Sequence, residues 1–164
     1  MNKRLIILVG PKGSGKTYIG SLVLEKLDVE FFRVEDVWLK LKENRFSDNY
    51  MQTGYLKVEK EIHRKFKETN RLIIETTAAD NESIKFINRL KNYFIVKLIK
   101  VNTSPRICLK RIKTRDQSNH VPVSEDRLEE INRKSIMADL RFDLVINNDD
   151  LSNEEILETI SQIV

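Results

Sequence analysis

Residues 10–17 of the chain read Gly10-Pro11-Lys12-Gly13-Ser14-Gly15-Lys16-Thr17. They match G-x-x-x-x-G-K-[ST], the pattern of a phosphate-binding loop. The apolar run at residues 5–9 precedes the loop and reads as a buried strand, and residues 15–27 are compatible with a helix. Strand, loop and helix in this order are the context that the pattern requires, and together they predict a nucleoside triphosphate site. The alternative is a glycine-rich turn that only closes a strand–helix unit, but such a turn does not need a Gly-Lys-Thr ending.

Each residue type in this loop has a physical role. The glycines permit positive φ angles and leave room for backbone N–H groups to converge on phosphate oxygens. The helix that begins near Gly15 adds its unpaired N–H groups and the positive end of its dipole. Lys16 is expected to reach the terminal phosphates, and the Thr17 hydroxyl is expected to coordinate Mg²⁺. The predicted ligands are therefore ATP and Mg²⁺.

Composition limits the class of protein. The chain has 164 residues, of which 40% are hydrophobic, and this suits a single domain over residues 1–164 with a buried core. No apolar run is long enough to span a bilayer, so no membrane partner is expected. A single cysteine, Cys108, excludes an internal disulfide and favours a reducing compartment, which predicts a cytoplasmic protein. The net charge of +4 suits polyanionic substrates but is too small to indicate nucleic-acid binding.

Apolar runs alternate with amphipathic segments along the whole chain. This pattern predicts an α/β fold of three layers, in which helices cover both faces of a five-stranded parallel sheet. The expected strands are residues 4–9, 30–34, 72–74, 93–101 and 144–146. The expected helices are residues 15–27, 37–42, 54–68, 80–90 and 104–113, with two more that start at Ser124 and Ser152, while residues 44–52 and 114–123 are expected to be irregular.

Ligands in such folds gather at the carboxyl ends of the strands, so polar residues that follow strands are candidates for the site. Asp36 is expected to orient or deprotonate an acceptor hydroxyl, although it could instead only cap the helix that follows. Glu75 is expected to hold Mg²⁺ through water or to contact the acceptor, and a purely structural role is its alternative. Glu35 is expected to be a cap or a solvated residue.

Arg111 and Arg115 are spaced i, i+4, so both should project from one helix face toward the loop that follows. A guanidinium group suits this place because its planar fork binds phosphate and stacks on a base. A solvated helix face is the alternative in so basic a chain. His120 in the same loop could contact phosphate or simply be exposed.

Together these residues resemble the small P-loop kinases, the group that includes shikimate, gluconate, adenylate and polynucleotide 5′-kinases. The resemblance implies strand order 2-3-1-4-5 and a mobile lid, at about residues 114–124, that closes over ATP. It also implies that Arg111 stacks on adenine, that Arg115 approaches the transferring phosphate, and that the turn Asn147-Asn148 contacts the base.

The chain departs from two members of this group. Thr76-Thr77-Ala78-Ala79 stands where shikimate kinases have a glycine-rich run, and the Asp-Gly-aromatic-Pro sequence of adenylate kinases is missing. Shikimate and AMP are therefore not the favoured acceptors. The acceptor pocket is expected to be lined from Trp38 to Tyr55, although these aromatic side chains could equally be core. The residues concerned are Trp38, Arg45, Phe46, Tyr50 and Tyr55.

The leading prediction is an ATP- and Mg²⁺-dependent phosphotransferase. It would move the γ-phosphate to a small-molecule acceptor, with nucleosides and nucleotides favoured, and Lys16, Asp36 and Arg115 would be its catalytic residues. A polynucleotide 5′-hydroxyl kinase, with a nucleic-acid end as acceptor, is the alternative within this class. A regulatory NTPase without an acceptor is the alternative from another class, and Asp36 and the two arginines argue against it. The sequence carries no signal for the oligomeric state.

Overall fold

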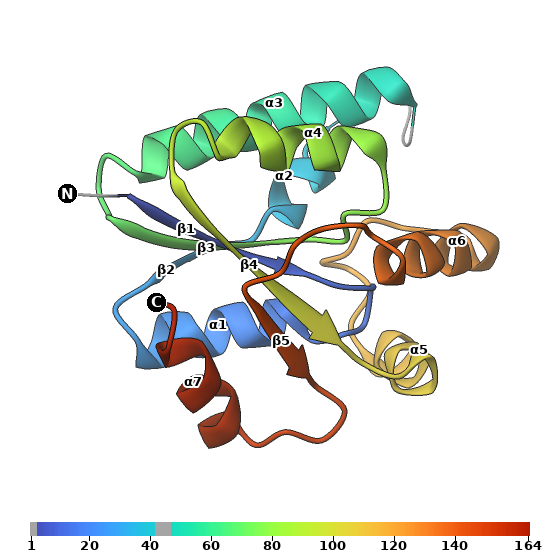
Figure 1. Ribbon diagram of the computed structural model, residues 1–164. Coiled ribbons are helices and arrows are strands. Elements are labelled where there is room, and N and C mark those ends of the chain that lie inside the picture. The colour runs from blue at the N-terminus through green and yellow to red at the C-terminus, as the bar shows by residue number, and fades with distance from the viewer. Residues whose placement is uncertain (1–2, 42–46) are drawn as a thin grey trace.

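The computed structural model describes residues 3–41 and 47–164. Five strands form one parallel sheet in the order β2-β3-β1-β4-β5 (Figure 1). The strands are β1 (Arg4–Val9), β2 (Glu30–Phe32), β3 (Arg71–Thr76), β4 (Ile95–Asn102) and β5 (Leu144–Asn147). β1 lies at the centre, where Leu5 pairs with Leu72 of β3 on one side and with Val96 of β4 on the other. Both the predicted fold class and the strand order that the resemblance implied are confirmed.

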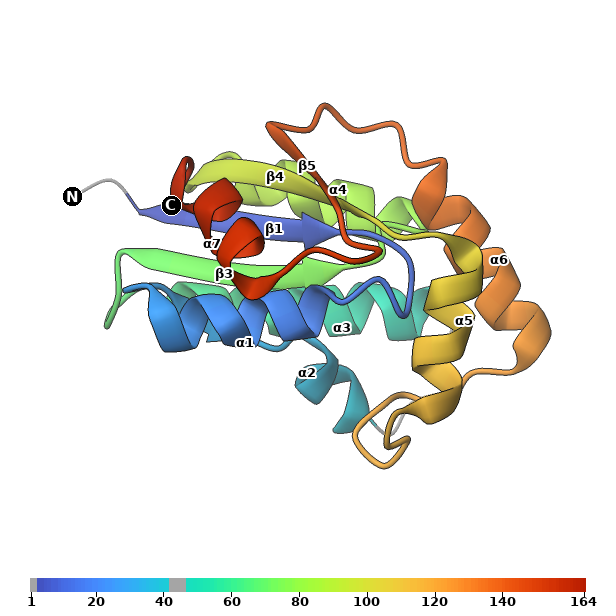
Figure 2. The same ribbon diagram turned by 90° about the horizontal axis from the view of Figure 1, so that it is seen from below.

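Helices cover both faces of the sheet (Figure 1). One face carries α3 (Asp48–Lys65) and α4 (Asn81–Leu90), and the other carries α1 (Lys16–Lys26) and α7 (Asn153–Ser161). The short helix α2 (Glu35–Leu39) follows β2. Two further helices, α5 (Pro105–Thr114) and α6 (Glu125–Ile136), lie beyond the carboxyl ends of the strands (Figure 2). These two helices therefore stand at the edge where ligands bind in such sheets.

The central strand explains why the predicted strands are almost wholly apolar. Leu5 and Ile7 of β1 belong to the core cluster under α3 and α4, whereas Ile6 and Leu8 belong to the cluster under α1 and α7. Successive side chains of a strand point to opposite faces, so a strand that is covered on both faces must be apolar throughout.

Several predicted boundaries are wrong, and three of them have a clear local reason. β2 ends at Phe32, because Val34 already has helical dihedral angles and α2 begins at Glu35. α3 begins at Asp48, inside the segment expected to be irregular, because the Ser47 side chain caps it by accepting from the Tyr50 N–H. β4 begins at Ile95 because the N–H groups of Tyr93 and Phe94 still donate to the Leu90 carbonyl.

Two helices start where the sequence predicts them. Ser152 caps α7 in a capping box with Glu155 as its partner, and Ser124 caps α6. Cys108 is buried on α5. Across residues 3–41 and 47–164, no helix combines the length and the hydrophobicity that crossing a bilayer demands.

Candidate active site

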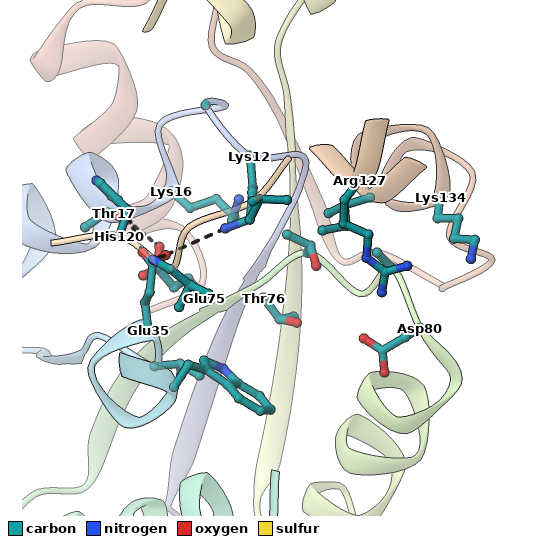
Figure 3. A pocket seen from close by; sticks show the side chains of 18 of the residues that line it. Lys12, Lys16, Thr17, Glu35, Glu75, Thr76, Asp80, His120, Arg127 and Lys134 are labelled. Carbon is teal, nitrogen blue, oxygen red and sulfur yellow. Dashed lines mark hydrogen bonds and ion pairs between the residues drawn. The ribbon is translucent and has the colours of Figure 1, made fainter. Parts of the chain in front are cut away.

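A cavity of about 380 Å³ lies at the carboxyl edge of the sheet. It is bordered by the phosphate-binding loop (residues 10–17), by α2 and α3, by the segment after β3, by the connection between α5 and α6, and by α6 itself (Figure 3). The predicted site residues in its lining are Lys12, Gly13, Gly15, Lys16, Thr17, Glu75, Arg111 and Arg115. The structure thus brings most of the predicted phosphate and metal residues to one space.

The phosphate-binding loop takes its shape from two glycines with positive φ. Gly13 has φ of 84° and Gly15 has φ of 95°, both in the region that glycine adopts without strain. A Cβ atom at Gly13 would lie 2.4 Å from the Cys108 carbonyl oxygen, and one at Gly15 would lie 2.4 Å from Nδ2 of Asn148. The loop is therefore seated closely against α5 and against the turn after β5.

The predicted base-contacting turn has a different visible role. Asn148 is buried, and its Nδ2 donates to the Ser14 carbonyl oxygen over 2.8 Å. Asn147 is exposed, and its Oδ1 accepts from Asn102. Neither asparagine lines the cavity, so a contact with the base stays a prediction, while the support that Asn148 gives to the loop is direct.

Lys16 and Glu75 are buried together beneath the loop. Nζ of Lys16 donates to the carbonyl oxygens of Gly10 and Pro11, each over 2.8 Å. Burial lowers the pKa of Lys16 to about 8, although the nearby Glu75 carboxylate favours the charged form. Burial also raises the pKa of Glu75, against the opposing effects of Lys16 and of the Thr17 hydrogen bond. Both charges are thus poorly solvated, as expected of a site that is completed by a charged ligand.

The donor set beside the loop fits Mg²⁺. Oγ1 of Thr17 donates to Oε2 of Glu75 over 2.7 Å, so a hydroxyl and a carboxylate lie side by side (Figure 3). Mg²⁺ prefers oxygen ligands and is held through one or two carboxylates together with water and substrate phosphates. Within the described ranges, no group of three or more His, Cys, Asp or Glu could hold a metal ion. Thr17 and Glu75 therefore suit an ion that is shared with a bound triphosphate.

Both predicted arginines line the cavity. Nη2 of Arg111 donates to the Asn148 carbonyl oxygen over 2.9 Å, which ties α5 to the turn after β5. Burial lowers the pKa of Arg115, but a guanidinium remains protonated in proteins. Nε of Arg115 is buried and has no hydrogen-bond partner among residues 3–41 and 47–164. A buried donor left over in this way suits an anionic ligand.

The prediction for Asp36 is wrong in its placement. Its side chain is 51% exposed, pairs with Nη1 of Arg33 over 2.6 Å, and does not line the cavity. Neighbouring residues of a helix point about 100° apart, and the early start of α2 turns Glu35 inward instead. Glu35, expected to be a cap or a solvated residue, lines the cavity with a side chain that is only 15% exposed. His120 also lines the cavity and lies 2.8 Å from Glu35.

The end of the cavity away from Thr17 contains charged residues that sequence reasoning missed (Figure 3). Glu130 of α6 accepts from Nη1 of Arg127 over 2.8 Å and from Nζ of Lys134 over 2.6 Å. Their helical spacing was the available signal, but the same spacing is typical of solvated helix faces. Asp80 caps α4 and accepts from the Tyr55 hydroxyl over 3.4 Å, and burial raises its pKa.

An aromatic wall connects the two ends. Trp38, Tyr50 and Tyr55 line the cavity, as predicted for an acceptor pocket. The Trp38 ring centroid lies 5.3 Å from that of Tyr50 and 5.0 Å from that of Tyr55. The two tyrosines are also almost fully buried, so they serve the core and the lining together. Arg45 and Phe46, predicted for the same pocket, lie outside the described residues.

Comparison with known proteins agrees with this geometry. The AAA domain family matches residues 5–135. A shikimate kinase of Thermodesulfovibrio yellowstonii is 26% identical over 160 residues, which cover 94% of this chain and 91% of that protein. A solved structure from Chloroflexus aurantiacus has a TM-score of 0.74 at 15% identity and full coverage of both chains. The deoxyadenosine kinase of M. mycoides has a TM-score of 0.64 at 22% identity, with 97% of this chain and 98% of that chain covered.

The two structural likenesses show a shared fold, and the family match spans most of the sequence, including the phosphate-binding loop and the two predicted arginines, Arg111 and Arg115. With its parallel sheet in the order 2-3-1-4-5 and the Lys16, Thr17 and Glu75 arrangement at the carboxyl edge, this chain belongs to the AAA domain family and has the fold of the small P-loop kinases.

Proposed function

We propose that this protein, with Mg²⁺ bound, transfers the γ-phosphate of ATP to a hydroxyl or phosphate group of a small molecule, with nucleosides and nucleotides the favoured acceptors. One observation carries the proposal. A single cavity is lined both by the phosphate-binding loop and by an acceptor compartment, which consists of Trp38, Tyr50, Tyr55 and Asp80. A triphosphate on the loop would therefore share an enclosed space with a second substrate.

The residues of the loop suit in-line phosphoryl transfer, in which positioning and charge stabilisation supply most of the catalysis. The backbone N–H groups around Gly13 and Gly15 and the Lys16 ammonium would bind the phosphates. Thr17 and Glu75 would hold Mg²⁺, which neutralises phosphate charge when bound. Arg115, whose Nε has no hydrogen-bond partner in the part of the chain that the structure describes, would stabilise the charge that develops on the transferred group.

The acceptor compartment supports a planar acceptor. Aromatic side chains offer flat apolar surfaces against which a nucleobase packs well. The Asp80 carboxylate accepts hydrogen bonds, and its raised pKa makes it a better proton acceptor than an ordinary aspartate. Asp36 is exposed and is no longer a candidate for this role. The fold shared with a deoxyadenosine kinase is consistent with a nucleoside, whereas Thr76–Ala79 departs from the glycine-rich run of shikimate kinases.

The two alternatives are less well supported. A regulatory NTPase would need no second compartment, yet this cavity extends well beyond the loop. A polynucleotide 5′-hydroxyl kinase finds no support in the relatives described above.

The proposal further takes residues 1–164 as a single kinase domain, in which residues of about 114–124 form a lid. Arg115, His120, Val121 and Val123 of this segment border the cavity.

A phosphotransfer screen with γ-labelled ATP tests the proposal. The acceptors are nucleosides including deoxyadenosine, nucleoside monophosphates, shikimate, gluconate and an oligonucleotide with a 5′-hydroxyl end. We expect the label to appear on a nucleoside or nucleotide. The Lys16→Ala variant should lose this transfer, whereas the control variant Lys113→Ala, which removes an exposed lysine outside the cavity, should retain it. Release of inorganic phosphate alone with every acceptor would refute the kinase assignment, and label on the oligonucleotide alone would favour the polynucleotide alternative.

A further inference from the structure

Glu35 holds the connection between α5 and α6 against α2. Its Oε1 accepts from the Val121 N–H over 2.9 Å, and its Oε2 lies 2.8 Å from Nδ1 of His120. Nη2 of Arg33 donates to the Asn119 carbonyl oxygen beside them. Three consecutive residues of the connection, 119–121, are therefore bound at the corner between β2 and α2. We call residues 114–124 the lid from here on.

The same carboxylate reaches the phosphate-binding loop. Oε1 of Glu35 lies 3.6 Å from Nζ of Lys12, and its Oε2 lies 3.2 Å from Nη2 of Arg33. Figure 3 shows Lys12, Glu35 and His120 converging at one end of the cavity. Lys12 occupies a position of the loop pattern that can hold any residue type, so its side chain is free to serve this contact. Glu35 is thus the meeting point of the loop and the lid.

Lys12 is also fixed from the other side. Oδ1 of Asn132, on α6, accepts from the Lys12 N–H over 2.8 Å, and Nδ2 of Asn132 donates to the Lys12 carbonyl oxygen over 3.2 Å. One side-chain amide therefore satisfies both backbone groups of Lys12. Because the backbone of Lys12 is anchored in this way, its ammonium gives Glu35 a firm attachment to the loop.

We propose that Glu35 is a positioning residue that latches the lid to the phosphate-binding loop, and that it does not act as the base for the acceptor hydroxyl. This inference rests on the proposed function, because loop and lid together would enclose ATP. With the lid docked, Arg115 near its start is held beside the loop in the cavity lining.

The environment of Glu35 supports a latch and argues against a base. Its two oxygens already face four groups, Lys12, Arg33, His120 and the Val121 N–H, so little room is left for an acceptor hydroxyl. Burial favours the neutral acid, but Lys12, the Val121 N–H and His120 outweigh it and lower the pKa of Glu35. A carboxylate that is stabilised in its charged form holds donors well and accepts protons poorly.

Hydrogen–deuterium exchange of the lid peptide in the ligand-free protein tests the latch without any need for kinase activity. Glu35→Gln removes the charge and Glu35→Ala removes the acceptor oxygens, while His120→Ala removes the contact between the His120 ring and Glu35. We expect the lid to exchange about tenfold faster in Glu35→Ala, with smaller increases in the other two, since charge-assisted hydrogen bonds are among the stronger ones. Glu129→Gln, an exposed glutamate on α6, is the matched control and should leave the exchange unchanged.

Steady-state kinetics separates the two roles of Glu35. A latch predicts that Glu35→Gln raises KM for ATP several-fold and lowers kcat by less than about tenfold, whereas loss of a general base lowers kcat by about 10²–10⁴. Lid exchange equal to that of the unmodified protein in both Glu35 variants, with circular dichroism showing that they are folded, overturns the proposal. Faster lid exchange in a protein without any phosphotransfer activity would uphold the latch and refute the proposed function instead.

Discussion

Adding one methyl group at Gly54 should force the Trp38 wall of the cavity to move. Gly54 is buried within α3, and a Cβ atom there would lie 1.8 Å from Cζ3 and 2.2 Å from Cη2 of Trp38. Carbon atoms in contact stay about 3.5–4.0 Å apart, so the indole would have to retreat by roughly 1.5 Å or more. Tyr50 and Tyr55 pack against the same ring and oppose that retreat.

Two effects of Gly54→Ala compete. Alanine in place of glycine inside a helix stabilises it by about 1 kcal/mol, whereas forcing extra atoms into a packed region costs about 1–3 kcal/mol. Because the indole is rigid and backed by two other rings, we expect the packing cost to lie near its upper limit. The predicted net effect is a free energy of unfolding lower by about 1–2 kcal/mol.

Urea unfolding followed by circular dichroism gives this free energy, and a double-mutant cycle isolates the clash. In a Trp38→Leu background the clash is gone, so Gly54→Ala should then stabilise the protein by up to about 1 kcal/mol. Trp38 is the only tryptophan of the sequence, so its emission spectrum should also shift in Gly54→Ala. Gln52→Ala, at an exposed position of the same helix, is the control and should stay within about 0.5 kcal/mol. Stabilisation by Gly54→Ala in the unmodified background, with unchanged emission, would refute the reasoning.

Three further predictions concern the loop, the latch and the segment after β3. Thr17→Val removes the hydroxyl beside Glu75, and titration calorimetry should show that Mg²⁺ no longer strengthens ATP binding; an undiminished Mg²⁺ effect would contradict the assigned metal ligands. The lowered pKa of Glu35 makes its contribution to stability fully present above the ordinary value of 4.5 and lost as pH falls through the lower folded value. The stability difference between the unmodified protein and Glu35→Gln should therefore shrink in acid, and a difference that is constant from pH 7 to pH 3 would argue against a buried ionised latch. Ala78 has φ of 50°, so Ala78→Gly should leave the free energy of unfolding unchanged or raise it by up to about 1 kcal/mol. Ala78→Val should lower it by about 2 kcal/mol or more, because a β-branched side chain tolerates this backbone conformation poorly. Equal thermal unfolding of both variants would show that the backbone there is not strained.

Much of the fold could be predicted because its signals are local. The glycines of residues 10–17 set the loop conformation through their own dihedral angles, and the caps at Ser124 and Ser152 act on N–H groups three residues away. The uninterrupted apolar run at residues 5–9 of β1 indicates that both faces of this strand are covered. The strand order, by contrast, came with the resemblance to a known group of kinases and was confirmed by the structure.

Within the site, too, the placement of a residue could be predicted where the signal is local. The cavity lining contains Lys16, Thr17, Glu75 and the two arginines, as expected, because each follows a strand or shares a helix face with its partner; their roles stay predictions. The prediction that Asp36 rather than Glu35 faces the site was wrong, because it depends on the residue at which α2 begins and on how that helix is turned toward the cavity. A shift of one residue turns a helical side chain by about 100°, and local propensity does not determine a helix start to that accuracy.

The remaining features arise from packing between segments far apart in the chain. Asn132 binds the backbone of Lys12, from which it is separated by 120 residues of sequence. The Trp38 ring packs closely against Gly54. Arg127 and Lys134 line the cavity only because α6 lies across the carboxyl edge of the sheet. The residues that neighbour these positions in the sequence do not indicate which partner each one contacts. Patterns of neighbouring residues were enough to specify strands, caps and the phosphate-binding loop, whereas the relative placement of helices minimises the free energy of the whole core, and that placement alone settled which side chains share the site.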